Sequence, residues 1–110
     1  MKLANYKACI CEGSAKNAIM DILLDCNLLI FTREEMNEEE VIRCREGKKF
    51  EQKYLRKGFK DKISVIRILD SRHENFKLSK AYADKVDAIK KYHEMSKVPK
   101  GEYTLLDLLR

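Results

Sequence analysis

Tryptophan is absent from this chain of 110 residues, and proline occurs once. The scarcity of proline excludes a proline-rich linker between two folded parts. The longest apolar runs, such as residues 28–31, are far shorter than the about 20 residues that a membrane-spanning helix needs. A chain of this length is typical of one domain, and we therefore predict a single domain over residues 1–110 that does not enter a membrane.

The sequence also shows neither a secretory signal nor the spacing of a zinc site. Residues 1–7 lack the apolar stretch of a signal peptide, so we expect a cytoplasmic protein whose cysteines are reduced. Cys9 and Cys11 lie two positions apart in an apolar run and are expected to face the same side of a strand. The other two cysteines and both histidines are isolated, so the sequence does not contain the paired spacing of four zinc ligands. We interpret the cysteines as small core residues.

Charge is distributed unevenly along this basic chain, whose formal net charge is +5 at pH 7. Residues 34–40 contain five acids and no base, whereas residues 43–62 contain nine bases against three acids, a local net charge of +6. Such a segment is either a solvated surface or a basic face that binds phosphates or an acidic partner. For the second interpretation, the candidate binding residues are Arg45, Lys49, Lys53, Arg56, Lys57 and Lys60. The aromatic residues among them, Phe50, Tyr54 and Phe59, either stack on unpaired bases or pack in the core.

The apolar pattern predicts alternating strands and helices. The predicted strands are residues 6–11, 28–31 and 63–69. The predicted helices are residues 14–26, a broken helical region over 32–57 that starts with the capping-box spacing of Thr32 and Glu35, and 79–96. In the first helix, the apolar residues recur at helical spacing and make one continuous apolar stripe: Ala15, Ala18, Ile19, Ile22, Leu23 and Cys26.

Helix-length connections between apolar strands imply parallel crossovers. The predicted fold is therefore an α/β domain with a small, mostly parallel sheet of three to four strands flanked by helices. Ligands of such sheets bind beyond the carboxyl ends of the strands. In this sequence those ends are residues 12–14, 32–34 and 70–72.

Glu12 and Asp70 are the carboxylates at these predicted strand ends. Magnesium prefers oxygen ligands and is often held by only one or two protein carboxylates together with substrate phosphates. We predict that Glu12 and Asp70 are such a catalytic, metal-binding pair. Gly13 would let the backbone approach a phosphate, and Ser14 with the first amides of the next helix would receive one of its oxygens.

Arg72 or Arg33 could neutralise charge that develops on a phosphoryl group at this site. The same strand-end residues also have ordinary structural explanations. Glu12 suits the positive end of a helix, Gly13 suits a tight turn, and Asp70 suits a turn as well. The sequence alone leaves both interpretations open.

The order of these elements resembles the TOPRIM fold of topoisomerases, primases and related nucleases. That family places Glu-Gly after its first strand and two Asp residues, separated by one residue, after a later strand, and these carboxylates bind Mg²⁺. Glu12-Gly13 matches the first motif and Asp70 the first position of the second. Arg72 stands where the family has its second Asp, which makes the TOPRIM-like core degenerate and weakens the case for catalysis.

Residues 6–90 also resemble a group of uncharacterised proteins of bacteria and their phages. The resemblance is carried by 10–13, 44–45, 54–59, 68–72 and 75–82. It implies an origin in a phage or mobile element and a location in the cytoplasm of a bacterial host cell. Members of that group continue with a further strand and helix, so the resemblance implies that this chain is a shortened relative.

Two classes of function fit these features. The first is a small phage-type binding protein that modulates or inhibits a nucleic-acid-processing or defence machine, with nucleic acid or a protein complex as its partner. The alternative is a metal-dependent, TOPRIM-like phosphodiesterase or nuclease that uses Glu12 and Asp70. In addition, residues 103–109 are very apolar, and we predict that they are buried against the domain or in a homodimer, with 103–110 as an oligomerisation tail.

Overall fold

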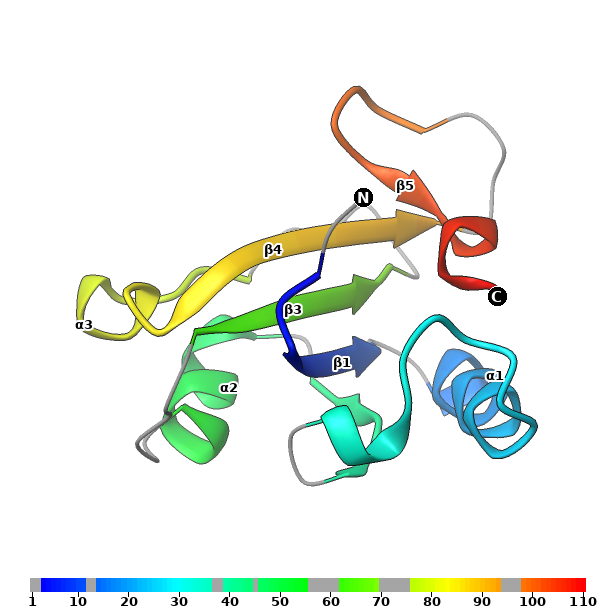
Figure 1. Ribbon diagram of the computed structural model, residues 1–110. Helices are drawn as coiled ribbons and strands as arrows, with labels where there is room; N and C mark the ends of the chain where they lie inside the picture. The colour runs from blue at the N-terminus through cyan, green and yellow to red at the C-terminus, as the bar shows by residue number, and fades with distance from the viewer. Residues whose placement is uncertain are drawn as a thin grey trace.

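The computed structural model of the chain describes residues 3–11, 14–36, 39–44, 46–55, 62–69, 76–93 and 98–110 (Figure 1). These residues form a five-stranded sheet in the order β2-β1-β3-β4-β5, in which every neighbouring pair is parallel. The strands are β1 (Tyr6–Cys11), β2 (Ile42–Arg43), β3 (Ile63–Ile68), β4 (Val86–His93) and β5 (Tyr103–Thr104). The predicted parallel α/β fold is confirmed, with five strands in place of three to four.

The helices lie between the strands in the chain, as in other parallel sheets. They are α1 (Ser14–Asp25), α2 (Gly47–Tyr54) and α3 (Lys80–Ala83), with short 3₁₀ helices η1 (Arg33–Glu35) and η3 (Leu105–Leu108). No helix in the described part of the chain is both long enough and apolar enough to span a bilayer.

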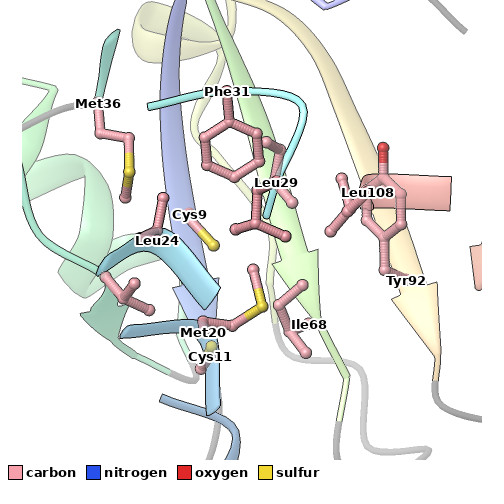
Figure 2. Packing of buried hydrophobic residues seen from close by; sticks show 12 residues of the cluster. Cys9, Cys11, Met20, Leu24, Leu29, Phe31, Met36, Ile68, Tyr92 and Leu108 are labelled. Atoms are coloured by element: carbon pink, nitrogen blue, oxygen red, sulfur yellow. The ribbon is translucent and has the colours of Figure 1, made fainter. Parts of the chain in front are cut away.

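The central strands separate two apolar layers because alternate side chains of a strand point to opposite faces. Cys9 and Cys11 of β1 pack with α1 in one layer, the α1-side core (Figure 2). Ala8 and Ile10 pack with α2 in the other layer, the α2-side core. All six residues of β3 are buried, as expected for a strand covered on both faces. The prediction that Cys9 and Cys11 share one side is confirmed.

The predicted strand at residues 28–31 is wrong. This segment lies outside the sheet and pairs with the C-terminal tail, where Leu29 and Leu109 form an isolated antiparallel bridge. Asn27 ends α1 with a positive φ of 58°, and Leu29 and Phe31 then bury their side chains in the α1-side core. The apolar run therefore anchors a loop to the core. In the sequence, such a loop has the same short apolar run as a buried strand.

The helical region predicted over residues 32–57 is also largely wrong. The Thr32 amide does donate to the Glu35 carboxylate at 2.7 Å, so the predicted capping box is correct, but η1 ends after one turn. The chain then forms β2, and the only long helix described in this region is α2, which begins at Gly47.

The helix predicted over residues 79–96 is replaced by the single turn of α3 and the eight-residue strand β4. Tyr82, Val86, Ile89 and His93 recur at helical spacing, which explains the prediction. In the structure the second edge of β3 pairs with β4 from Ile63 to Ile68. Sheet pairing satisfies the backbone groups of this buried strand, and the tertiary context overrides the local pattern.

Most of the predicted apolar stripe of α1 is exposed, although Leu23 packs against the α1-side core. Met20 and Leu24 are the buried residues of this helix, whereas Ile19 is 42% exposed and Ile22 is 61% exposed. In the C-terminal tail, Leu108 is fully buried and Leu106 is 74% exposed. The predicted burial of the tail against its own domain is therefore correct for part of it.

Candidate functional site

The carboxyl ends of β1, β2 and β3 meet at one edge of the sheet. Cys11 is the register partner of Ile68 in β3 and of Arg43 in β2, and the Cys44 amide donates to the Cys11 carbonyl at 3.0 Å. From β1 the chain first builds β2 on one side and then β3 on the other, so the strand order reverses here. This position is where open parallel sheets bind ligands. The prediction that the first strand and the strand at 63–69 are parallel neighbours is confirmed.

The residues that would carry the metal chemistry at this edge lie outside the described residues: Glu12, Gly13, Asp70 and Arg72. Ser14 starts α1, but its side chain is also outside the description. Within the described ranges, no group of three or more His, Cys, Asp and Glu side chains is arranged to hold a metal ion. The Mg²⁺ pair and the TOPRIM resemblance therefore stay predictions.

Arg33 does not lie at the carboxyl edge, because the predicted strand before it does not join the sheet. Its guanidinium bonds the carboxylates of Asp21 and Asp25 at 3.1 and 3.0 Å. Met36, just after η1, forms an isolated parallel β-bridge with Lys7 near the amino end of β1. The candidate role of Arg33 beside a strand-end phosphate is corrected to a structural one, in which it ties η1 to α1.

The outward face of α2 is cationic. Its exposed positions are Lys48, Lys49, Gln52 and Lys53. The one acid of this helix, Glu51, is 5% exposed, and its carboxylate accepts the Ser79 amide at 2.7 Å. The negative charge of α2 is therefore turned inward, and we call Lys48, Lys49 and Lys53 the basic face.

This face includes two of the six predicted binding residues, Lys49 and Lys53. The other four, Arg45, Arg56, Lys57 and Lys60, lie outside the described residues. The basic face is thus a described part of the larger segment 43–62.

A cleft of about 430 Å³ lies beside the basic face. Its lining residues are Asn17, Glu40, Val41, Ile42, Arg43, Lys53 and Tyr54. The Lys53 ammonium lies 5.5 Å from the centre of the Tyr54 ring. Tyr54 is half-buried and also contacts Phe50, which is fully buried in the α2-side core. Phe50 is therefore a core residue. Tyr54 packs against the core, but its ring is partly exposed to solvent beside the basic side chains of Lys53 and Arg43.

A second cleft of about 450 Å³ shares Asn17, Glu40 and Val41 with the first. Its other lining residues are Asp21, Asp25 and Arg33, so the two clefts have opposite charge character. The Asn17 side-chain amide donates to the Val41 carbonyl at 3.1 Å and holds α1 against the chain before β2. An anionic ligand would be favoured at the end with Arg43 and Lys53 and repelled by Asp21 and Asp25.

An ionisable pair at the end of β4, His93 and Glu102, has no signature in the sequence. His93 Nε2 and Glu102 Oε1 lie 2.5 Å apart, and both side chains are about three-quarters buried. His93 looked isolated because its partner comes into reach only when β5 pairs with β4, through Tyr92–Tyr103 and His93–Thr104. This pair ties Glu102, just before β5, to the last residue of β4.

A second polar contact, between Lys7 and Glu35, lies at the amino end of β1. The ammonium of Lys7, whose side chain is 7% exposed, bonds the Glu35 carboxylate at 2.9 Å. The hydrogen bond from Lys7 is the main cause that lowers the pKa of Glu35. This contact stabilises the fold and lies away from the carboxyl edge.

The described functional features are thus the carboxyl edge at β1 and β3, the basic face of α2 and the two adjoining clefts beside it. No protein-family model, no curated protein and no solved structure matches this chain.

Proposed function

We propose that this chain is a small phage-type binding protein that modulates or inhibits a nucleic-acid-processing or defence machine. It binds nucleic acid, or an acidic protein of that machine, through the basic face of α2. The observation that supports the proposal is the sorting of charge on α2: the bases are exposed, and the one acid is buried and hydrogen-bonded.

This sorting has a simple electrostatic consequence. A lysine next to an exposed carboxylate loses much of its attraction for phosphate, because the carboxylate neutralises it locally. Glu51 does not neutralise Lys49 and Lys53 in this way, because its buried carboxylate accepts a hydrogen bond from the Ser79 amide. Lys53 and Arg43 also line the cleft with Tyr54, a ring on which an unpaired base can stack.

The test is salt-dependent binding with matched charge changes. The double variant Lys49→Glu/Lys53→Glu and the control Lys90→Glu/Lys100→Glu both lower the net charge by four; Lys49, Lys53 and Lys100 are exposed, and Lys90 is half-buried. Lys90 lies on β4, and Lys100 lies in the turn before β5, both outside the basic face. We expect the first variant alone to lose most binding to single-stranded and duplex oligonucleotides, with a shallower salt dependence.

An equal loss in both variants would mean that only the total charge matters and would contradict the proposed face. If neither the wild type nor the variants bind nucleic acid, the same pair of variants is tested for capture of acidic protein complexes from a bacterial lysate, followed by reconstitution with the purified partner. Failure in both assays refutes the proposal.

A second candidate function is supported by the sheet topology. The parallel neighbours β1 and β3 lead directly into Glu12 and Asp70 at the point where the strand order reverses. A TOPRIM-like phosphodiesterase would need both carboxylates to hold Mg²⁺. We expect hydrolysis of nucleic acid with Mg²⁺ or Mn²⁺, and its loss in Glu12→Gln and Asp70→Asn, if this function is present. Metal-independent binding with no cleavage would favour the binding protein.

A further inference from the structure

The helix α1 is apolar on two sides, although a surface helix normally has one apolar face. Met20 and Leu24 face the α1-side core. Asn17, Asp21 and Asp25 form a polar side that contacts Val41 and Arg33. The remaining side carries Ala18, Ile19, Ile22 and, just after the helix, Cys26, and all four are exposed.

Further exposed apolar side chains lie beyond the C-terminal end of α1. The Leu28 amide donates to the Leu23 carbonyl of the helix at 2.9 Å, and the Leu28 carbonyl accepts the Arg110 amide at 2.8 Å. The Ile30 amide donates to the Leu108 carbonyl, which joins the C-terminal tail to this segment. Figure 1 shows the C-terminus on the same side of the molecule as α1.

We define the outer apolar surface as six residues: Ile19, Ile22, Leu28, Ile30, Leu106 and Leu109. These are all but one of the large apolar side chains that are exposed within the described ranges, and the exception, Ile89, lies on β4. Their exposed fractions together correspond to about three fully exposed side chains. Concentration of apolar exposure on one side marks an interaction surface.

We propose that a second copy of this chain covers the outer apolar surface, with the two α1 helices antiparallel across a two-fold axis. The charges beside the surface favour this occupant. They are balanced: Lys16, Asp21 and Asp25 lie on α1, where Arg33 bonds the two carboxylates, and Asp107 and Arg110 lie in the C-terminal tail. Two copies can therefore approach here without the repulsion expected of a chain with net charge +5, and an acidic partner would be drawn to the basic face of α2 instead.

The antiparallel orientation follows from the charge along α1. Its N-terminal half carries Lys16 and the positive end of the helix, and its C-terminal end is the negative end, where Asp21 and Asp25 share the charge of Arg33. Parallel packing would place like ends together, whereas antiparallel packing places unlike ends together. A two-fold axis midway between Ile19 and Ile22 then puts Ile19 of each copy opposite Ile22 of the other. The apolar side chains form the centre of the interface and the charged ones its rim.

The outer apolar surface can supply the centre of a dimer interface. A stable interface buries roughly 800 Å² on each partner, with an apolar centre and a polar rim. The surface extends from α1 to the C-terminal tail, and its exposure corresponds to about three fully exposed side chains, so a dimer of standard size also buries part of the polar rim.

The first experiment measures mass by light scattering and sedimentation over a range of concentrations. We expect the wild type to have twice the chain mass of 12.9 kDa. Ile22→Glu should raise the dissociation constant by roughly thirtyfold or more, as for a residue at the centre of an interface. The control Ile89→Glu changes an apolar residue on β4 that is 40% exposed, against 61% for Ile22. Its register partner Val65 belongs to the α2-side core, and this variant should remain dimeric. Circular dichroism checks that both variants are folded.

The second experiment locates the interface with a thiol reagent. Cys26 is exposed, Cys44 is half-buried, and Cys9 and Cys11 are buried. In a Cys44→Ser background, Cys26 should react more slowly as the protein concentration rises, and Ile22→Glu should remove this dependence. A wild type that stays monomeric up to its solubility limit would overturn the proposal. So would a dimer in which Cys26 reacts at one rate at all concentrations.

Discussion

The C-terminal tail offers a direct test of which leucines stabilise the domain. Leu108 is fully buried in the α1-side core, where Figure 2 shows it near Tyr92, whereas Leu106, two residues away, is 74% exposed. Replacing a buried leucine by alanine costs about 2–5 kcal/mol, through lost transfer free energy and the cavity that remains. This is a large part of the about 5–15 kcal/mol that stabilises a domain. Leu106→Ala removes the same atoms from a mostly hydrated position and should cost less than about 0.5 kcal/mol.

Both substitutions are best compared in the Ile22→Glu background, where self-association does not contribute to stability. Urea unfolding gives the free energy of unfolding, and thermal unfolding should show a Tm that is lower by roughly 10 °C or more for Leu108→Ala. Similar losses for the two variants would refute the assignment of Leu108 to the core and of Leu106 to the surface. A stable chain without residues 103–110 would refute it as well.

Two other substitutions test the amino end of β1 and the start of α2. Because Lys7 lowers the pKa of Glu35, this pair stabilises the fold at pH values above 4.5, the ordinary pKa of the carboxyl group. The contribution is lost as the pH falls through the lowered pKa. The difference in Tm between the wild type and Glu35→Gln should therefore be large near neutral pH and shrink in acid; a difference independent of pH would contradict the ion pair. Gly47→Ala would place a Cβ within 2.4 Å of the Lys77 carbonyl oxygen, and we expect a loss of about 1–3 kcal/mol in urea unfolding, with an unaffected variant showing that the contact is not close.

The parts of the fold that the sequence predicted are those with one dominant pattern. The continuous apolar run of β3 is typical of a strand covered on both faces, and the run before Glu12 with a helix after it indicated β1 and α1. The parallel arrangement of β1 and β3, and hence the location of the candidate site at their carboxyl ends, followed from the helical connections.

The remaining features depend on contacts that no local pattern contains. In α1, Ile19 and Ile22 recur at helical spacing as well as Met20 and Leu24 do, so periodicity could not select the inward face. The apolar residues of β4 fit the spacing of a helix as well as the alternation of a strand. The segment is a strand because it pairs with the edge of β3 that β1 leaves free. The burial of Glu51, which leaves the α2 face basic, depends on the Ser79 amide 28 residues further along the chain.

The two proposed surfaces lie on opposite faces of the sheet, and this has a consequence for binding. Since α1 and α2 cover opposite layers, a dimer formed through α1 leaves the basic face of each copy pointing away from the other. One dimer should then bridge two nucleic acids or two partner molecules, whereas a monomer binds one. Energy transfer between two differently labelled oligonucleotides measures bridging directly. Ile22→Glu should abolish transfer while each oligonucleotide still binds, and Lys49→Glu/Lys53→Glu should abolish both. Equal transfer with wild type and Ile22→Glu would show that bridging does not pass through α1.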